Sequence, residues 1–252
     1  MSGITRQEAW GSASRGFVCF LANAGIFLSY DKKTFLIDGL HRGSRRFSAS
    51  TDEQIRDIVA GAGIFRRIDC MLVTHDHSDH YDLTLTRRLL RNHPETVLIS
   101  PATPSDRTSG RLDQPEGYAL MPDMEVHFLQ LAHEGPGYED VVNYGYDVRV
   151  GDFEFVVTGD AAISAPGLAH LTEGRTADAA FVNFPFLTLK AGRAAMKNAL
   201  RARRFFVFHL PFEEDDTENY RKSAFWAASK ADELGLPPTV LLAFPDTCIP
   251  LD

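Results

Sequence analysis

The stretch "THDHSDH", Thr74 to His80, contains three histidines and two aspartates within seven residues. It directly follows the apolar run "CMLV", which is typical of a short buried strand. His75 and His77 are two positions apart, so in extended backbone their imidazoles point to the same side and could reach one ion. Asp79 and His80 follow in the turn and could reach a second ion nearby. Imidazole and carboxylate ligands together suit zinc, manganese or iron.

Three more ligand-type side chains each follow an apolar run. His133 follows "LQLA", Asp160 follows "FVVTG" and His209 follows "FFVF". The carboxyl ends of strands are a common place for site residues in layered α/β folds. Each residue alone is more typical of an ordinary turn, but together with the histidine-rich stretch they indicate a metal centre. Asp38 in "FLIDG" also ends a strand, and we expect it to orient a ligand rather than bind the metal.

The rest of the chain reads as hairpins of strands followed by alternating strands and helices. Apolar and alternating runs predict strands within 16–39, 70–75, 96–100, 124–132, 143–160, 179–184, 204–210 and 238–244, the last being the final strand. Helical patterns cover 51–63, 82–94, 189–203 and 217–235. Thr51 and Gln54 have capping-box spacing at the start of the first helix, and Gly61 is expected to end it. Residues 101–123, rich in Pro, Gly, Ser and Asp, are expected to form a long loop.

Composition narrows the class of protein. The chain has 252 residues, a net charge of −8 and a pI of about 5.6, so nothing favours binding to phosphate backbones, and we expect no nucleic-acid partner. No apolar run approaches the length of a membrane span, and the first residues lack an apolar signal, so we expect a cytoplasmic protein. Three widely spaced cysteines are expected to be small buried side chains in a reduced chain. The oligomeric state stays open, and a homo-oligomer is compatible with the sequence.

These motifs resemble those of the metallo-β-lactamase superfamily. The stretch "THDHSDH" matches its H-x-H-x-D-H signature, and "FLIDG" resembles its first motif. The sequences "LAH", "TGD" and "FHL" match its third, fourth and fifth motifs in order. The resemblance implies an α/β fold, a four-layer αββα sandwich of two mixed β-sheets with helices on both outer faces. It also implies one domain over residues 1–252, in which 1–14 form a loose N-terminal segment.

The resemblance further implies a hydrolase with two divalent metal ions, zinc being the leading candidate and manganese or iron the alternatives. The implied ligands are His75, His77 and His133 for the first ion, Asp79, His80 and His209 for the second, and Asp160 as a bridge between them. In such a site a bridging hydroxide attacks the substrate, because two nearby cations lower the pKa of a shared water. Asp79 is also the candidate catalytic residue, since it could orient the nucleophile or pass a proton to the leaving group.

The segments "HSDHYD" and "ANAGIFLSYDKKTFLIDG" look like the branch that contains L-ascorbate-6-phosphate lactonase and N-acyl-phosphatidylethanolamine phospholipase D. That branch implies a small-molecule substrate, namely an ester, lactone or phosphoester. Arg42 and Arg45 in "GLHRGSRR" are candidate substrate residues, because guanidinium groups bind phosphate or carboxylate, although an ordinary solvated basic loop is the competing interpretation. Three alternatives stay open: a mononuclear iron redox enzyme similar to persulfide dioxygenases, a phosphodiesterase or nuclease, and a metal-binding scaffold without catalysis.

Overall fold

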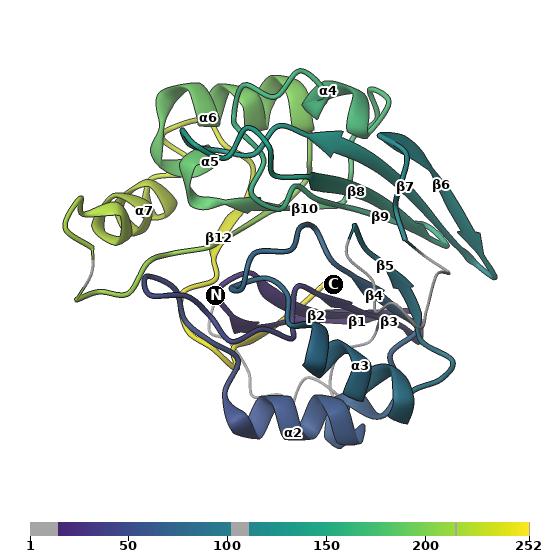
Figure 1. Ribbon diagram of the computed structural model, residues 1–252. Helices are drawn as coiled ribbons and strands as arrows, with labels where there is room; N and C mark the ends of the chain where they lie inside the picture. The colour runs from purple at the N-terminus through teal and green to yellow at the C-terminus, as the bar shows by residue number, and fades with distance from the viewer. Residues whose placement is uncertain (1–14, 102–110, 215, 252) are drawn as a thin grey trace. The chain divides into compact units, whose positions relative to one another are not determined.

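The computed structural model describes residues 15–101, 111–214 and 216–251. The chain divides into two compact units: residues 1–113 with 244–252, and residues 114–243. Each unit contains one mixed β-sheet with its own helices (Figure 1), so the predicted α/β class with two mixed sheets is confirmed. The segment 1–14, expected to be loose, lies outside the described residues, and the single domain over 1–252 stays a prediction. Within the described ranges, no helix has the length and apolar character needed to cross a membrane.

The first unit contains a six-stranded sheet in the order β13-β1-β2-β3-β4-β5. The first four strands pair antiparallel, and β3, β4 and β5 pair parallel. The strands are β1 (Gly16–Ala22), β2 (Gly25–Tyr30), β3 (Lys33–Ile37), β4 (Cys70–Leu72), β5 (Val97–Ile99) and β13 (Cys248–Pro250). Pro250, which cannot donate a backbone hydrogen bond, lies on the edge strand, where a sheet tolerates proline.

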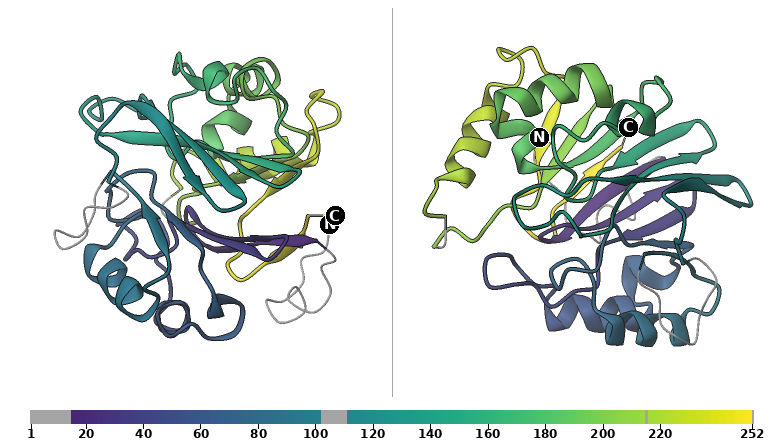
Figure 2. Two further views of the ribbon diagram at one scale, coloured as in Figure 1. Left: turned by 90° about the vertical axis from the view of Figure 1, so that its right-hand side faces the viewer. Right: turned by 45° about the horizontal axis from the view of Figure 1, so that its top comes forward.

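Two helices, α2 (Asp52–Ala60) and α3 (Leu83–Asn92), and a 3-10 turn (Gly63–Arg66) cover one face of this sheet. Their apolar side chains share a buried core with β1 to β4, and Figure 2 shows both blue helices on the same side of the purple strands. The predicted capping box of α2 is confirmed: Thr51 Oγ1 accepts from Gln54 N at 3.1 Å, and Gln54 Oε1 accepts from Thr51 N at 2.8 Å. Gly61 ends α2 with φ 68°, a left-handed conformation that glycine adopts without strain.

The second unit contains a seven-stranded sheet in the order β12-β11-β10-β9-β8-β7-β6. Strands β6 to β9 form an antiparallel meander, and β9 to β12 are parallel. The strands are β6 (Glu116–Met121), β7 (Met124–Leu131), β8 (Asn143–Val150), β9 (Phe153–Val157), β10 (Ala179–Asn183), β11 (Phe205–Phe208) and β12 (Thr239–Leu241). The helices are α4 (Leu168–Leu171), α5 (Phe184–Thr188), α6 (Lys190–Ala195) with a following π turn (Met196–Leu200), and α7 (Tyr220–Ser229). Apolar residues of all four helices, or of the turns that end them, pack with the sheet in a second core.

Three expectations about the elements are wrong. Part of the expected loop 101–123 is strand β6, which pairs along its whole length with β7; residues 102–110 of that loop lie outside the described residues. The strand predicted at 238–244 is not the last, because β13 follows it in sequence. Helix α7 begins at Tyr220 rather than near 217, since both carboxylate oxygens of Asp216 accept from backbone N–H groups of its first turn, at 2.7 and 2.8 Å.

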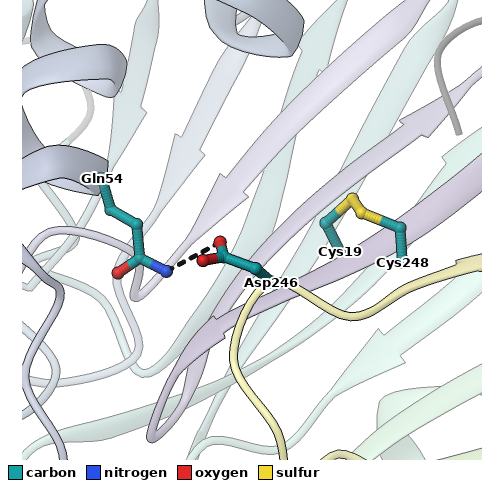
Figure 3. The surroundings of a disulfide bond; sticks show 4 residues. All are labelled: Cys19, Gln54, Asp246 and Cys248. Carbon is teal, nitrogen blue, oxygen red and sulfur yellow. Dashed lines mark hydrogen bonds between the residues drawn. A yellow bond between two sulfur atoms is a disulfide. The ribbon is translucent and has the colours of Figure 1, made fainter. Parts of the chain in front are cut away.

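The expectation of reduced cysteines is also wrong. Cys19 on β1 and Cys248 on β13 lie opposite each other in the sheet and form a disulfide, while Cys70 is a buried free thiol. Figure 3 shows this bond beside Asp246, whose carboxylate accepts from Gln54 Nε2 at 3.0 Å. An odd cysteine count and wide spacing could not reveal the pairing, because it depends on strands 229 residues apart in the chain.

Candidate metal centre

In the first unit, the histidine-rich stretch forms the loop between β4 and α3. The loop leaves the sheet after β4, where Val73 N still donates to Ile99 O at 3.0 Å. His75 and His80 are fully buried, whereas Asp76 faces solvent. His75 Nε2 and His77 Nδ1 are 3.0 Å apart, so the two histidines predicted to point the same way do come together.

Asp38 accepts several of the hydrogen bonds that hold this loop. It is 1% exposed, follows the end of β3 and has φ 45°, a left-handed conformation that is uncommon for a residue other than glycine. Its carboxylate accepts from Thr74 N at 2.9 Å, from Thr74 Oγ1 at 2.6 Å and from His80 Nδ1 at 2.9 Å. Asp38 therefore holds a histidine and the start of the loop, the arrangement expected of a residue that orients ligands.

These hydrogen bonds decide which nitrogen of each ring has the lone pair. The hydroxyl of Thr74 donates to Asp38, so at 3.0 Å its oxygen accepts from the Nδ1–H of His75. His80 likewise directs Nδ1 to the carboxylate of Asp38. In a neutral ring with hydrogen on Nδ1, the lone pair is on Nε2. His75 and His80 are thus held in the tautomer in which Nε2 can bind a metal ion.

Asp79 has a partner that sequence reasoning missed. Asn23, in the turn between β1 and β2, donates from Nδ2 to Asp79 O at 3.0 Å and to Asp79 Oδ2 at 3.2 Å. Both residues are buried, at 1% and 7% exposure. The two positions are 56 residues apart, so no local pattern in the sequence could indicate this contact.

The candidate substrate residues lie on the segment after Asp38. The backbone N–H of Arg42 donates to Ser78 O at 3.3 Å, which places this segment beside the histidine-rich loop. The guanidinium of Arg42 lies 3.6 Å from a carboxylate oxygen of Asp82, and the side chain of Arg45 is exposed. His41, which belongs to the same segment, is fully buried instead: its Nε2 contacts Ala22 O at 3.3 Å, and its Nδ1 accepts from Gly43 N at 3.1 Å.

In the second unit, His133, Asp160 and His209 come together after the ends of strands β7, β9 and β11, as predicted for strand-end residues. Asp160 Oδ2 is 3.0 Å from His209 Nε2 and 3.7 Å from His133 Nε2. The Nδ1 of His133 contacts the carbonyl oxygen of Glu134 at 2.8 Å. A carbonyl only accepts, so Nδ1 carries the hydrogen and the Nε2 of His133 has the lone pair. His209 has φ 68°, a strained backbone of the kind that clusters at functional sites.

Two buried asparagines support the turn that contains Asp160, and no motif in the sequence indicates either of them. Asn143, at the start of β8, accepts from Asp160 N at 3.1 Å and donates to Thr158 O at 3.2 Å. Asn183, at the end of β10, donates to Ala161 O at 3.4 Å. The backbone of this turn is therefore held from two neighbouring strands, which fixes the position of the carboxylate.

Comparison with solved structures shows the fold. A metallo-β-lactamase fold protein from Bacillus subtilis matches with a TM-score of 0.62 and 17% identity over 93% of this chain and 98% of that one. A metallo hydrolase from the archaeon Ignicoccus hospitalis matches with a TM-score of 0.64 and 14% identity over 93% and 97%. A diiron β-hydroxylase from Streptomyces venezuelae matches with a TM-score of 0.53 and 13% identity over 90% of this chain and 53% of that enzyme. No family model and no curated protein sequence matches this chain.

These matches, together with the two mixed sheets, show that the chain has the metallo-β-lactamase fold. The fold expected from the sequence motifs is thereby confirmed.

Proposed function

We propose that this protein is a metal-dependent hydrolase whose centre holds two divalent ions, with zinc as the leading candidate and manganese or iron as alternatives. The observation that carries the proposal is the contact of the Nδ1 atoms of three histidines with oxygen atoms, from which their tautomers follow. His75, His80 and His133 each direct Nδ1 to an oxygen acceptor, so each has Nε2 as its ligand atom. Oxygen partners on the far nitrogen are the usual support of metal-binding histidines. A donor set of imidazole and carboxylate fits ions of this kind.

We assign the ligands by motif. His75, His77 and His133 would hold one ion, Asp79, His80 and His209 the other, and Asp160 would be shared. When bound, two such ions supply positive charge that polarises a substrate oxygen and lowers the pKa of water.

The protein's own groups position the ligands and move a proton. Asp38 and Thr74 keep His75 and His80 in the ligand tautomer, so no reorientation of these rings is needed on binding. Asp79 is the candidate to pass a proton to the leaving-group oxygen, because a carboxylate at the reacting centre can act as a general acid and base.

For the substrate we propose a small ester, lactone or phosphoester, as expected for the branch that contains L-ascorbate-6-phosphate lactonase and N-acyl-phosphatidylethanolamine phospholipase D. The exposed Arg42 and Arg45, on a segment tied to the histidine-rich loop, are the candidates to bind a phosphate or carboxylate of that substrate.

Metal analysis tests the proposal most directly. Protein purified without added metal should contain about two ions per chain and should hydrolyse a member of a panel of phosphodiesters, lactones and β-lactams. His77→Ala should abolish this hydrolysis, whereas His170→Ala should leave it intact, because His170 lies on α4 and contacts Glu116 rather than the cluster. Undiminished hydrolysis by metal-stripped protein would refute the proposal.

A second candidate is a mononuclear iron redox enzyme on the same fold, similar to persulfide dioxygenases. A diiron β-hydroxylase from Streptomyces venezuelae has a similar fold, so iron-dependent oxidation is compatible with this architecture, although that neighbour uses two irons. A single bound iron and oxygen consumption with a thiol substrate would favour it over hydrolysis.

A further inference from the structure

Asn23 is a buried asparagine with a left-handed backbone and hydrogen bonds to a residue of the candidate centre. It follows β1 in the short turn to β2, is 1% exposed and has φ 47°. Asparagine adopts this left-handed conformation more readily than most residues, because its short side chain can hydrogen-bond locally. Here, however, the side chain bonds to a residue 56 positions away.

The amide of Asn23 has two hydrogens on Nδ2, and Asp79 receives bonds from this nitrogen at two atoms. One distance, 3.0 Å, joins Nδ2 to the main-chain oxygen of Asp79, and the other, 3.2 Å, joins it to Oδ2 of the same residue. The torsion that rotates a carboxylate is broad and soft in a free aspartate. Because one rigid amide contacts both the backbone and the carboxylate, it fixes how the carboxylate is turned relative to the loop.

The side-chain oxygen and the backbone N–H of Asn23 also indicate that this residue holds the loop of Asp79 in place. Among the residues described, Oδ1 of Asn23 is buried without a hydrogen-bond partner. Burying an acceptor without a partner is unfavourable, so the two donor bonds of the side chain are what favours its burial. The backbone N–H of Asn23 donates to Ser48 Oγ at 2.9 Å, which ties the turn to the segment that carries Arg42 and Arg45.

We propose that Asn23 is a positioning residue for Asp79. Its amide holds the Asp79 carboxylate in the orientation that binds the second metal ion and passes a proton to the leaving group. The inference rests on the proposed function, since it assigns a role within the same centre. It predicts a selective defect. The ion assigned to Asp79, His80 and His209 should be held less tightly, while the ion assigned to His75, His77 and His133 should be unaffected.

The test is a titration of metal-stripped protein with Co²⁺ alone, followed by visible absorption. Asn23→Gly keeps the left-handed backbone and removes both donors. Asn23→Asp keeps the size and the acceptor but cannot donate at neutral pH. Asn219→Gly is the matched control, because Asn219 has φ 57°, is exposed and precedes α7 in the second unit. Both Asn23 variants should bind the first equivalent like the wild type and the second equivalent about 10–100-fold more weakly. Asn219→Gly should bind both like the wild type.

Three results of this titration would overturn the positioning role of Asn23. Wild-type affinity for both equivalents in the two Asn23 variants would overturn the inference. So would a defect in Asn23→Gly that Asn23→Asp does not share, because the side chain would then only fill space. A loss of the first equivalent as severe as that of the second would overturn it too, as a general disruption of the fold. If the wild type itself binds fewer than two equivalents of Co²⁺, the proposed dinuclear centre is refuted together with the inference. If the wild type binds two equivalents and the Asn23 variants bind like it, only the inference is refuted.

Discussion

The disulfide between Cys19 and Cys248 makes a quantitative prediction about stability. The bond closes a loop of 229 residues and joins an edge strand of three residues to β1. In the chain-entropy model, cross-linking a loop of this length stabilises the folded state by roughly 5 kcal/mol, because it restricts the unfolded chain. Cys248→Ala removes the link while leaving Cys19 and the rest of β1 intact.

Urea unfolding of the oxidised wild type, the reduced wild type and Cys248→Ala checks the magnitude. The last two should unfold at similar urea concentrations, both below the oxidised wild type by a free energy of up to about 5 kcal/mol. The reductant should change nothing in Cys248→Ala. A thiol assay on unfolded protein gives an independent check, since one of the three cysteines should react before reduction and all three after it. Equal stability of the oxidised wild type and Cys248→Ala, or three reactive thiols before reduction, would refute the reasoning.

Three further predictions follow from other parts of the structure. Gly192→Ala should lower the free energy of unfolding by about 1–3 kcal/mol in urea, because its Cβ would lie 2.3 Å from Pro185 O; an unchanged midpoint would contradict this. Burial and, after it, the charge of Glu154 raise the pKa of Asp147 to about 7. The folded state then binds a proton that the unfolded state releases, so stability should fall as pH rises from about 4 to about 7, and Asp147→Asn should lose this part of the pH dependence in thermal unfolding at several pH values. Asp38→Ala should weaken metal binding about 10–100-fold by calorimetry, and wild-type affinity would exclude the orienting role.

Local patterns were predictable from the sequence, and long-range pairs were not. The capping box of Thr51 and Gln54 depends on residues three apart, and the spacing alone predicted it correctly. The same Gln54 also donates to Asp246, 192 residues away, which no local pattern could show. Strand β6 was missed because its residues alternate between exposed and half-buried, as on an edge, and because a Pro- and Gly-rich segment precedes it.

The same division applies to the candidate centre. Strand-end positions correctly predicted that His133, Asp160 and His209 come together, because parallel strands end at one edge of a sheet. The supporting asparagines, Asn23 and Asn143, were missed, because their side chains bond across turns that are adjacent only in the folded chain. The sequence thus indicates which residues carry candidate ligand atoms, but not which residues position them.

The return of β13 to β1 has a consequence for biosynthesis. At about 5–20 residues per second, the ribosome takes on the order of 10–50 s to synthesise the 229 residues that separate Cys19 from its partner. During that time the first sheet lacks its edge strand, and Cys70 is the one other cysteine already made. Oxidation during translation therefore has a single wrong pairing open to it within the chain, the one between Cys19 and Cys70.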